Sequence, residues 1–109
     1  MNQKPKESDW KRFHRIVSDL RERYLKEKNV ELVGILNDPK RSPTEQFWDT
    51  FEKMKEERKI LIDCLDNHSR SHMFMSMALM CRYGMLKKED LEGFSDELRD
   101  RLNRFLEMG

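Results

Sequence analysis

The stretch Met73-Phe-Met-Ser-Met-Ala-Leu-Met-Cys81 decides the fold, because it is almost the only segment that is apolar on every side of a helix. A helix without a polar face has to lie at the centre of a folded chain. Charged residues make up 39% of the sequence, which contains only four glycines and three prolines. This composition favours long amphipathic helices over a turn-rich sheet. We therefore predict a helical protein built around a central helix over residues 69–83.

The N-terminal third has the pattern of an amphipathic helix followed by a short one. Ser8 is a good N-cap, and we expect the first helix to end near Lys28. Asn29 can cap a short helix from Val30 to Leu36. The residue before Pro39 is disfavoured in a helix, so a loop should follow. The first helix has an apolar face of residues spaced three and four apart: Trp10, Phe13, Val17, Leu20 and Tyr24.

The clearest start of a helix is Ser42-Pro43-Thr44-Glu45, where Ser and Glu have the spacing of a capping box and Pro occupies the first helical position. We expect the helix that follows to end at the cap-forming cluster Asp66-Asn67-His68-Ser69, where the chain reverses direction. Arg58 interrupts its apolar stripe, and Trp48 and Ile62 widen it. The predicted inner stripe consists of Phe47, Phe51, Met54, Leu61 and Leu65.

Two further signals complete the predicted architecture. Gly84 is placed to end the central helix in a left-handed conformation, and residues 87–91 suggest one further turn. Ser95 can cap a last amphipathic helix, with Phe94 packed against it. We predict an all-α antiparallel helical bundle of four main helices plus one or two short helices. Residues 1–7 should be a flexible N-terminus and residues 8–109 a single domain.

Several classes of protein are disfavoured by composition. No apolar run approaches the roughly 20 residues that cross a bilayer, and the first residues lack the apolar centre of a secretory signal. We expect no membrane association. Cys64 and Cys81 show neither CxxC spacing nor a second pair, so reduced thiols and a cytoplasmic location are expected.

A metal-binding or thiol-dependent protein is one alternative. If the helix ran on through Asp66, then Cys64, His68 and His72 would share one face at i, i+4 and i+8. A break near Asn67 separates them, and the methionines that follow point in several directions around a helix. The competing interpretation is a buried thiol beside methionines used for packing. No catalytic motif is present, so we expect no cofactor and assign no catalytic residue.

Nucleic-acid binding is a second alternative. The basic start of the first helix includes Lys11, Arg12 and Arg15, in a segment where residues 1–28 carry nine Lys/Arg and five Asp/Glu. Such a face can contact phosphates. However, Trp10 and Phe13 belong to the apolar stripe, which leaves them poorly placed to stack on bases.

Association with another protein is the interpretation we favour, in an adaptor or regulatory role and with a homodimer as one form. Flexible methionine side chains suit a surface that repacks around a partner, which makes Met73, Met77 and Met80 candidate contacts. Trp48 lies at the edge of its helix's apolar stripe, where an aromatic side chain often dominates binding energy. Lys11, Arg12 and Arg15 would form a steering rim.

Overall fold

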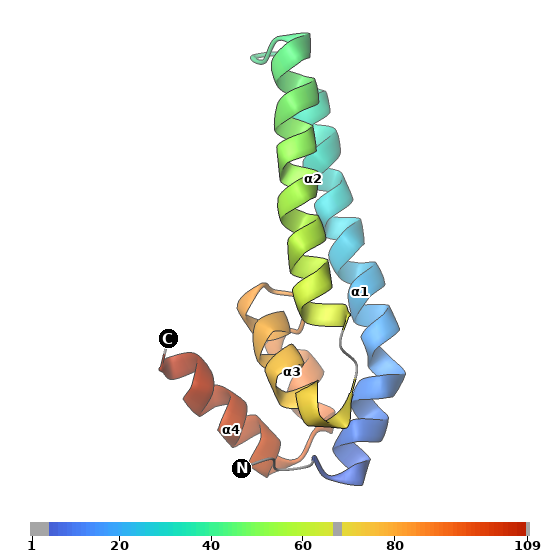
Figure 1. Ribbon diagram of the computed structural model, residues 1–109, viewed down its shortest axis with the longest axis vertical. Coiled ribbons are helices and arrows are strands. Elements are labelled where there is room, and N and C mark those ends of the chain that lie inside the picture. The colour runs from blue at the N-terminus through green and yellow to red at the C-terminus, as the bar shows by residue number, and fades with distance from the viewer. Residues whose placement is uncertain (1–4, 67–68, 109) are drawn as a thin grey trace.

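The computed structural model describes residues 5–66 and 69–108, and every regular element in those ranges is helical. The predicted all-α fold of four main helices plus one or two short ones is confirmed (Figure 1). In chain order the elements are α1 (Glu7–Leu36), α2 (Pro43–Leu65), η1 (Arg70–His72), α3 (Met73–Arg82), η2 (Lys88–Gly93) and α4 (Asp96–Glu107).

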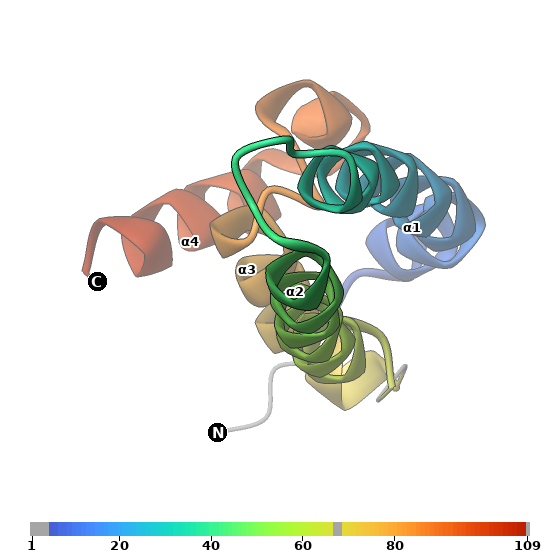
Figure 2. The same cartoon turned by 90° about the horizontal axis from the view of Figure 1, so that it is seen from above.

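The helices α1 and α2 form a long antiparallel hairpin, and we call these two helices its arms. The other helices gather at one end of the hairpin, its base, so the rest of the hairpin projects beyond them (Figure 1). Seen from above, α4 extends to the side of the hairpin (Figure 2). The described chain measures 51 × 24 × 23 Å and has a radius of gyration of 16.6 Å. A compact chain of this length would have about 13 Å, so the projection dominates the shape.

The helix α1 is one element of 30 residues, which corrects the prediction of two helices. Asn29 does not cap a new helix, because no proline or side-chain cap ends the first one there, and an exposed Asn costs a helix interior only about 0.5 kcal/mol. The N-cap is Lys6, so Ser8 lies within the first turn. Only the last residues of the predicted flexible segment 1–7 are described, and of these Glu7 begins α1.

The predicted capping box at the start of α2 is confirmed. The Glu45 N–H donates to Ser42 Oγ at 3.1 Å, and the Ser42 N–H donates to Glu45 Oε1 at 2.8 Å. The helix ends at Leu65, so it does not continue into the methionine-rich segment. Asn67 and His68, where the reversal was predicted, lie outside the described residues.

The prediction that the apolar segment lies at the centre is also confirmed. The side chains of Met73, Met77 and Met80 in α3 are at most 1% exposed, and α3 packs against both α2 and α4. Gly84 adopts a φ of +79°, as predicted for the residue that ends this helix. That left-handed turn lets the Met85 N–H donate to the Met80 carbonyl at 2.8 Å. The stripe on α1 also reaches this core.

Two polar contacts join α1 to the C-terminal part of the chain. The buried Asp9 carboxylate accepts hydrogen bonds from the Ser95 N–H at 2.9 Å and the Ser95 hydroxyl at 2.6 Å. Arg23 donates to both carboxylate oxygens of Asp90, at 3.0 and 2.6 Å, and to the Met85 carbonyl at 3.1 Å. Both contacts join segments more than sixty residues apart.

The Arg23–Asp90 contact predicts a stability that depends on pH. The hydrogen bond from Arg23 is the main cause that lowers the pKa of Asp90. Because the folded pKa lies below the unfolded value of about 3.9, the contact stabilises fully above that pH, and its contribution is lost as pH falls through the folded pKa. We expect Asp90→Asn to flatten this acid-side loss. Urea unfolding of both proteins between about pH 3 and pH 6 measures it, and identical slopes would remove Asp90 as the cause.

Candidate protein-binding surface

Polar side chains join the two arms of the hairpin. Buried residues on α2 recur every seven positions, at Thr50, Glu57 and Cys64. The buried Tyr24 hydroxyl donates to Glu57 Oε1, and Lys53 Nζ lies 3.3 Å from Glu57 Oε2. Burial and the Glu57 carboxylate raise the pKa of Tyr24, which therefore stays a neutral donor.

This arrangement corrects the predicted inner stripe of α2. Phe47, Phe51 and Met54 are not buried against α1, and their exposed fractions are 59%, 44% and 54%. The helix is rotated so that the stripe of Thr50, Glu57 and Cys64 faces inward instead. Leu61 and Leu65 of the predicted stripe are partly buried and pack against the core, whereas its other three residues lie beside the contact between the arms and meet solvent.

The exposed apolar side chains of the hairpin form what we call the hairpin surface. Isolated exposed hydrophobic residues are ordinary, but a group of them along one projecting element indicates an interaction site. Trp48, 55% exposed, stands edge-on to both Phe47 and Phe51, with ring centroids 5.0 and 5.9 Å away. The surface comprises Val30, Val33 and Leu36 of α1 and Phe47, Trp48, Phe51, Met54 and Ile62 of α2.

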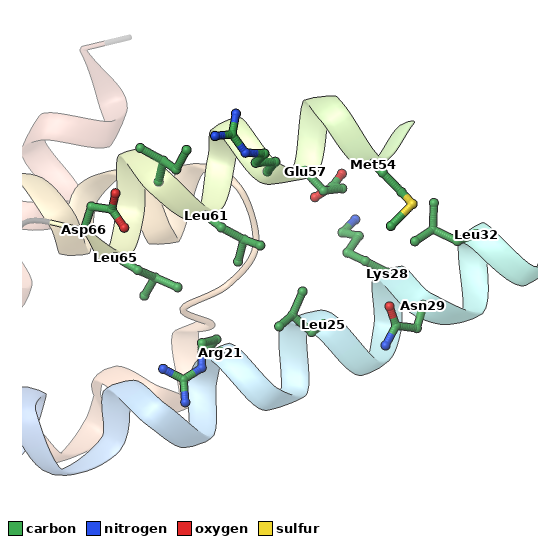
Figure 3. A pocket seen from close by; sticks show the side chains of 12 residues that line it. Arg21, Leu25, Lys28, Asn29, Leu32, Met54, Glu57, Leu61, Leu65 and Asp66 are labelled. Atoms are coloured by element: carbon green, nitrogen blue, oxygen red, sulfur yellow. The ribbon is translucent and has the colours of Figure 1, made fainter. Parts of the chain in front are cut away.

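A groove of about 700 Å³ runs between the arms on the same side of the hairpin. Figure 3 shows Leu25 of α1 and Leu61 and Leu65 of α2 pointing into it. Met54 and Ile62 belong both to this groove and to the hairpin surface, so the two are continuous. The groove is lined by Arg21, Leu25, Lys28, Asn29, Leu32, Met54, Glu57, Arg58, Leu61, Ile62, Leu65 and Asp66.

The predicted contact residues lie in three separate places. Trp48 lies on the hairpin surface, whereas Met73, Met77 and Met80 fill the core and present no surface to a partner. The predicted rim of Lys11, Arg12 and Arg15 lies near the start of α1, at the base. Lys11 and Arg15 are exposed there, while the Arg12 guanidinium packs over the Phe94 ring at 5.8 Å.

The residues of the metal and thiol hypothesis are not brought together among the residues described. Cys64 is fully buried, while His72 is exposed and its Nδ1 lies 2.8 Å from the Ser69 hydroxyl. His68 falls outside the described residues. Across residues 5–66 and 69–108, no group of three or more His, Cys, Asp or Glu side chains is arranged to hold a metal ion.

The two cysteines are expected to be poor nucleophiles in the folded protein. Burial raises the pKa of Cys64 and of Cys81 to about 11, so only about one thiol in a thousand ionises near pH 8. In a Cys81→Ser variant we expect Cys64 to react with Ellman's reagent at least about a hundredfold faster once guanidinium unfolds the chain. Rapid reaction of Cys64 in the native state would support the thiol-dependent hypothesis.

No protein-family model matches this chain, and no match was found among curated proteins or solved structures. Within the part of the chain that the structure describes, no helix is both long and apolar enough to cross a membrane. The fold and the surface thus define an all-α protein whose helical hairpin projects from a small core and has an apolar side.

Proposed function

We propose that this protein acts by binding another protein through the hairpin surface, in an adaptor or regulatory role. The observation that carries the proposal is the aromatic cluster of Phe47, Trp48 and Phe51, which is exposed on the projecting part of the hairpin. Apolar surface of this kind gains free energy when a partner removes it from water. Tryptophan in such a cluster is a common binding hot spot.

The placement of this cluster on a helix supports the proposal. The arms are joined by the buried contact between Tyr24 and Glu57, so a partner would meet a surface that is already ordered.

The proposal includes a cytoplasmic location. The two free cysteines, Cys64 and Cys81, agree with such a reducing compartment.

Trp48→Ala is expected to weaken partner binding by about 1–3 kcal/mol while leaving the fold intact, because its side chain contributes to the surface rather than to the core. Proteins captured from the native cell by the wild-type chain identify the partner, and titration calorimetry then compares the variants. The matched control is Met75→Ala, since Met75 is also exposed and apolar but lies on α3. Equal affinity of the Trp48→Ala and wild-type proteins for every captured partner would contradict the proposal.

Nucleic-acid binding at the start of α1 is a second candidate. Lys11 and Arg15 are exposed one turn apart and form no ion pair with any described residue. Their neighbour Lys6 is paired with Glu97 at 2.7 Å, which reduces the positive charge of this face. Binding at this face would weaken steeply with added salt, whereas binding at the hairpin surface would change little.

A further inference from the structure

We propose that the groove between the arms binds an amphipathic helix of the partner that carries an acidic residue near its middle. This inference rests on the proposed function and adds the chemistry of the segment that binds. Its grounds are the shape of the groove, the one lining cation that pairs with no carboxylate among the described residues, and the charges that a second copy of this chain would bring.

The groove has the length and the lining that suit a helix. It runs over residues 21–32 of α1 and 54–65 of α2, which at 1.5 Å per residue is about 17 Å, or three helical turns. Apolar residues on both walls are seven positions apart, Leu25 with Leu32 and Met54 with Leu61. A docked helix presents its own anchors with the same period, so it could contact apolar residues of both arms.

The charge at the centre of the groove selects an acidic partner. Arg58 lies between Met54 and Leu61 along α2, is exposed, and makes no ion pair with any residue that the structure describes. Its neighbour Glu57 is already engaged by Tyr24 and Lys53. Covering Arg58 with an apolar residue would remove water from an unpaired charge at considerable cost. A carboxylate on the docked helix would instead accept hydrogen bonds from its guanidinium.

The other charges in the groove leave this preference in place. Lys28 is paired with Glu31 at 3.0 Å. Arg21 is paired with Glu22 at 3.2 Å. The carboxylate of Asp66 lines the base end of the groove. Of the three cations that line the groove, Arg58 is therefore the one without an ion-pair partner among the residues described.

A second copy of this chain fits the same surface poorly. The exposed stripe of α2 consists of Trp48, Phe51, Lys55, Arg58 and Ile62, at alternating spacings of three and four. A two-fold axis through the middle of this stripe would place Lys55 of one copy against Lys55 of the other, with Arg58 of each copy one turn away. Like charges held together in this way cost several kcal/mol. The occupant is therefore a different chain that supplies negative charge at this position.

A displayed library of helices tests the inference. The library holds peptides of about 14 residues with Leu fixed at i, i+3, i+7 and i+10 and all other positions random, and the full chain is the bait. We expect the selected peptides to carry Asp or Glu at the middle of the Leu-bearing face. With Arg58→Glu as bait they should carry Lys or Arg there, and a peptide selected by the wild type should bind Arg58→Glu about tenfold more weakly or worse.

The matched control is Lys59→Glu, because Lys59 is exposed on the same helix but does not line the groove. This bait should select acidic peptides as the wild type does. Leu61→Asp, which places a charge on the groove wall, should abolish selection, and circular dichroism checks that this variant remains helical.

The outcomes separate this inference from the proposed function. If peptide selection depends on Leu61 but shows no preference for acidic residues, the inference of an acidic helix is overturned. The proposal that the hairpin surface binds a protein is then retained. Concentration-dependent dimers in sedimentation velocity that Trp48→Ala dissociates would make the second copy the occupant and also overturn it. If no peptide is selected, no dimer forms, and the Trp48→Ala variant captures the same proteins as the wild type, both proposals fail.

Discussion

Met77→Ala is expected to lower the free energy of unfolding by about 2–5 kcal/mol, whereas Met54→Ala should lower it by less than about 1 kcal/mol. The Met77 side chain is fully buried in α3, at the centre of the core. Its removal leaves a cavity whose walls lose packing contacts in addition to the lost transfer free energy. Met54 lies on α2 with half of its side chain in water, so its truncation opens no enclosed space.

Urea unfolding followed by helical circular dichroism measures both variants. The pair is well matched, because the residue type, the substitution and the helical setting are the same at both positions. The slope of free energy against urea should remain that of the wild type, which shows that the same surface is exposed on unfolding. Equal destabilisation by the two changes would mean that α3 is not the centre of the core or that the hairpin surface is buried.

A partner-binding assay should give the opposite order for the same two variants. Met54 belongs to the hairpin surface and to the groove, so its truncation should weaken binding. Met77→Ala should leave the affinity of the folded fraction unchanged, because no atom of its side chain reaches the surface. We therefore expect Met77 to contribute to packing and Met54 to partner binding.

The sequence could predict the elements whose signal is local. The α3 segment is apolar around its whole circumference, which requires burial in any arrangement of neighbours. The capping box at Ser42 and the cap at Ser95 depend on contacts within four residues, and both are present as predicted. Gly84 was predicted for the same reason, since the left-handed turn after a helix is a local requirement.

The hairpin surface could not be predicted because it depends on how far α2 is rotated about its axis. A stripe such as Phe47, Phe51 and Met54 has the period of a buried face, and periodicity does not say what covers it. The contact with α1 instead uses Thr50 and Glu57. Because polar residues are not expected on a buried face, the sequence pattern did not indicate this contact. The seven-residue spacing of Thr50, Glu57 and Cys64 was a weak indication of this buried face. It can be interpreted only once Tyr24 is known to donate to Glu57.

Glu57→Ala is expected to lower the free energy of unfolding by about 2–3 kcal/mol, a large effect for a charged residue on a projecting hairpin. The change leaves the Tyr24 hydroxyl buried without its acceptor and removes the partner of Lys53. Glu57→Gln should cost less, because the amide oxygen still accepts the hydrogen bond from Tyr24. Thermal and urea unfolding of the two variants, compared with Glu56→Ala at an exposed position of the same helix, measure this difference.

A double-mutant cycle with Tyr24→Phe assigns the effect to the contact between the arms. If the hydrogen bond carries it, the double variant should be more stable than the sum of the single changes predicts, by about 1 kcal/mol or more. Additive effects would instead mean that Glu57→Ala lowers the free energy of unfolding because Glu57 no longer pairs with Lys53. The contact would also bear on the proposed binding, because Glu57 joins the two walls of the groove and itself lines it. Glu57→Ala should therefore bind the acidic helix more weakly than Glu57→Gln, since both changes remove the same negative charge from the groove and only Glu57→Ala removes the hydrogen-bond acceptor.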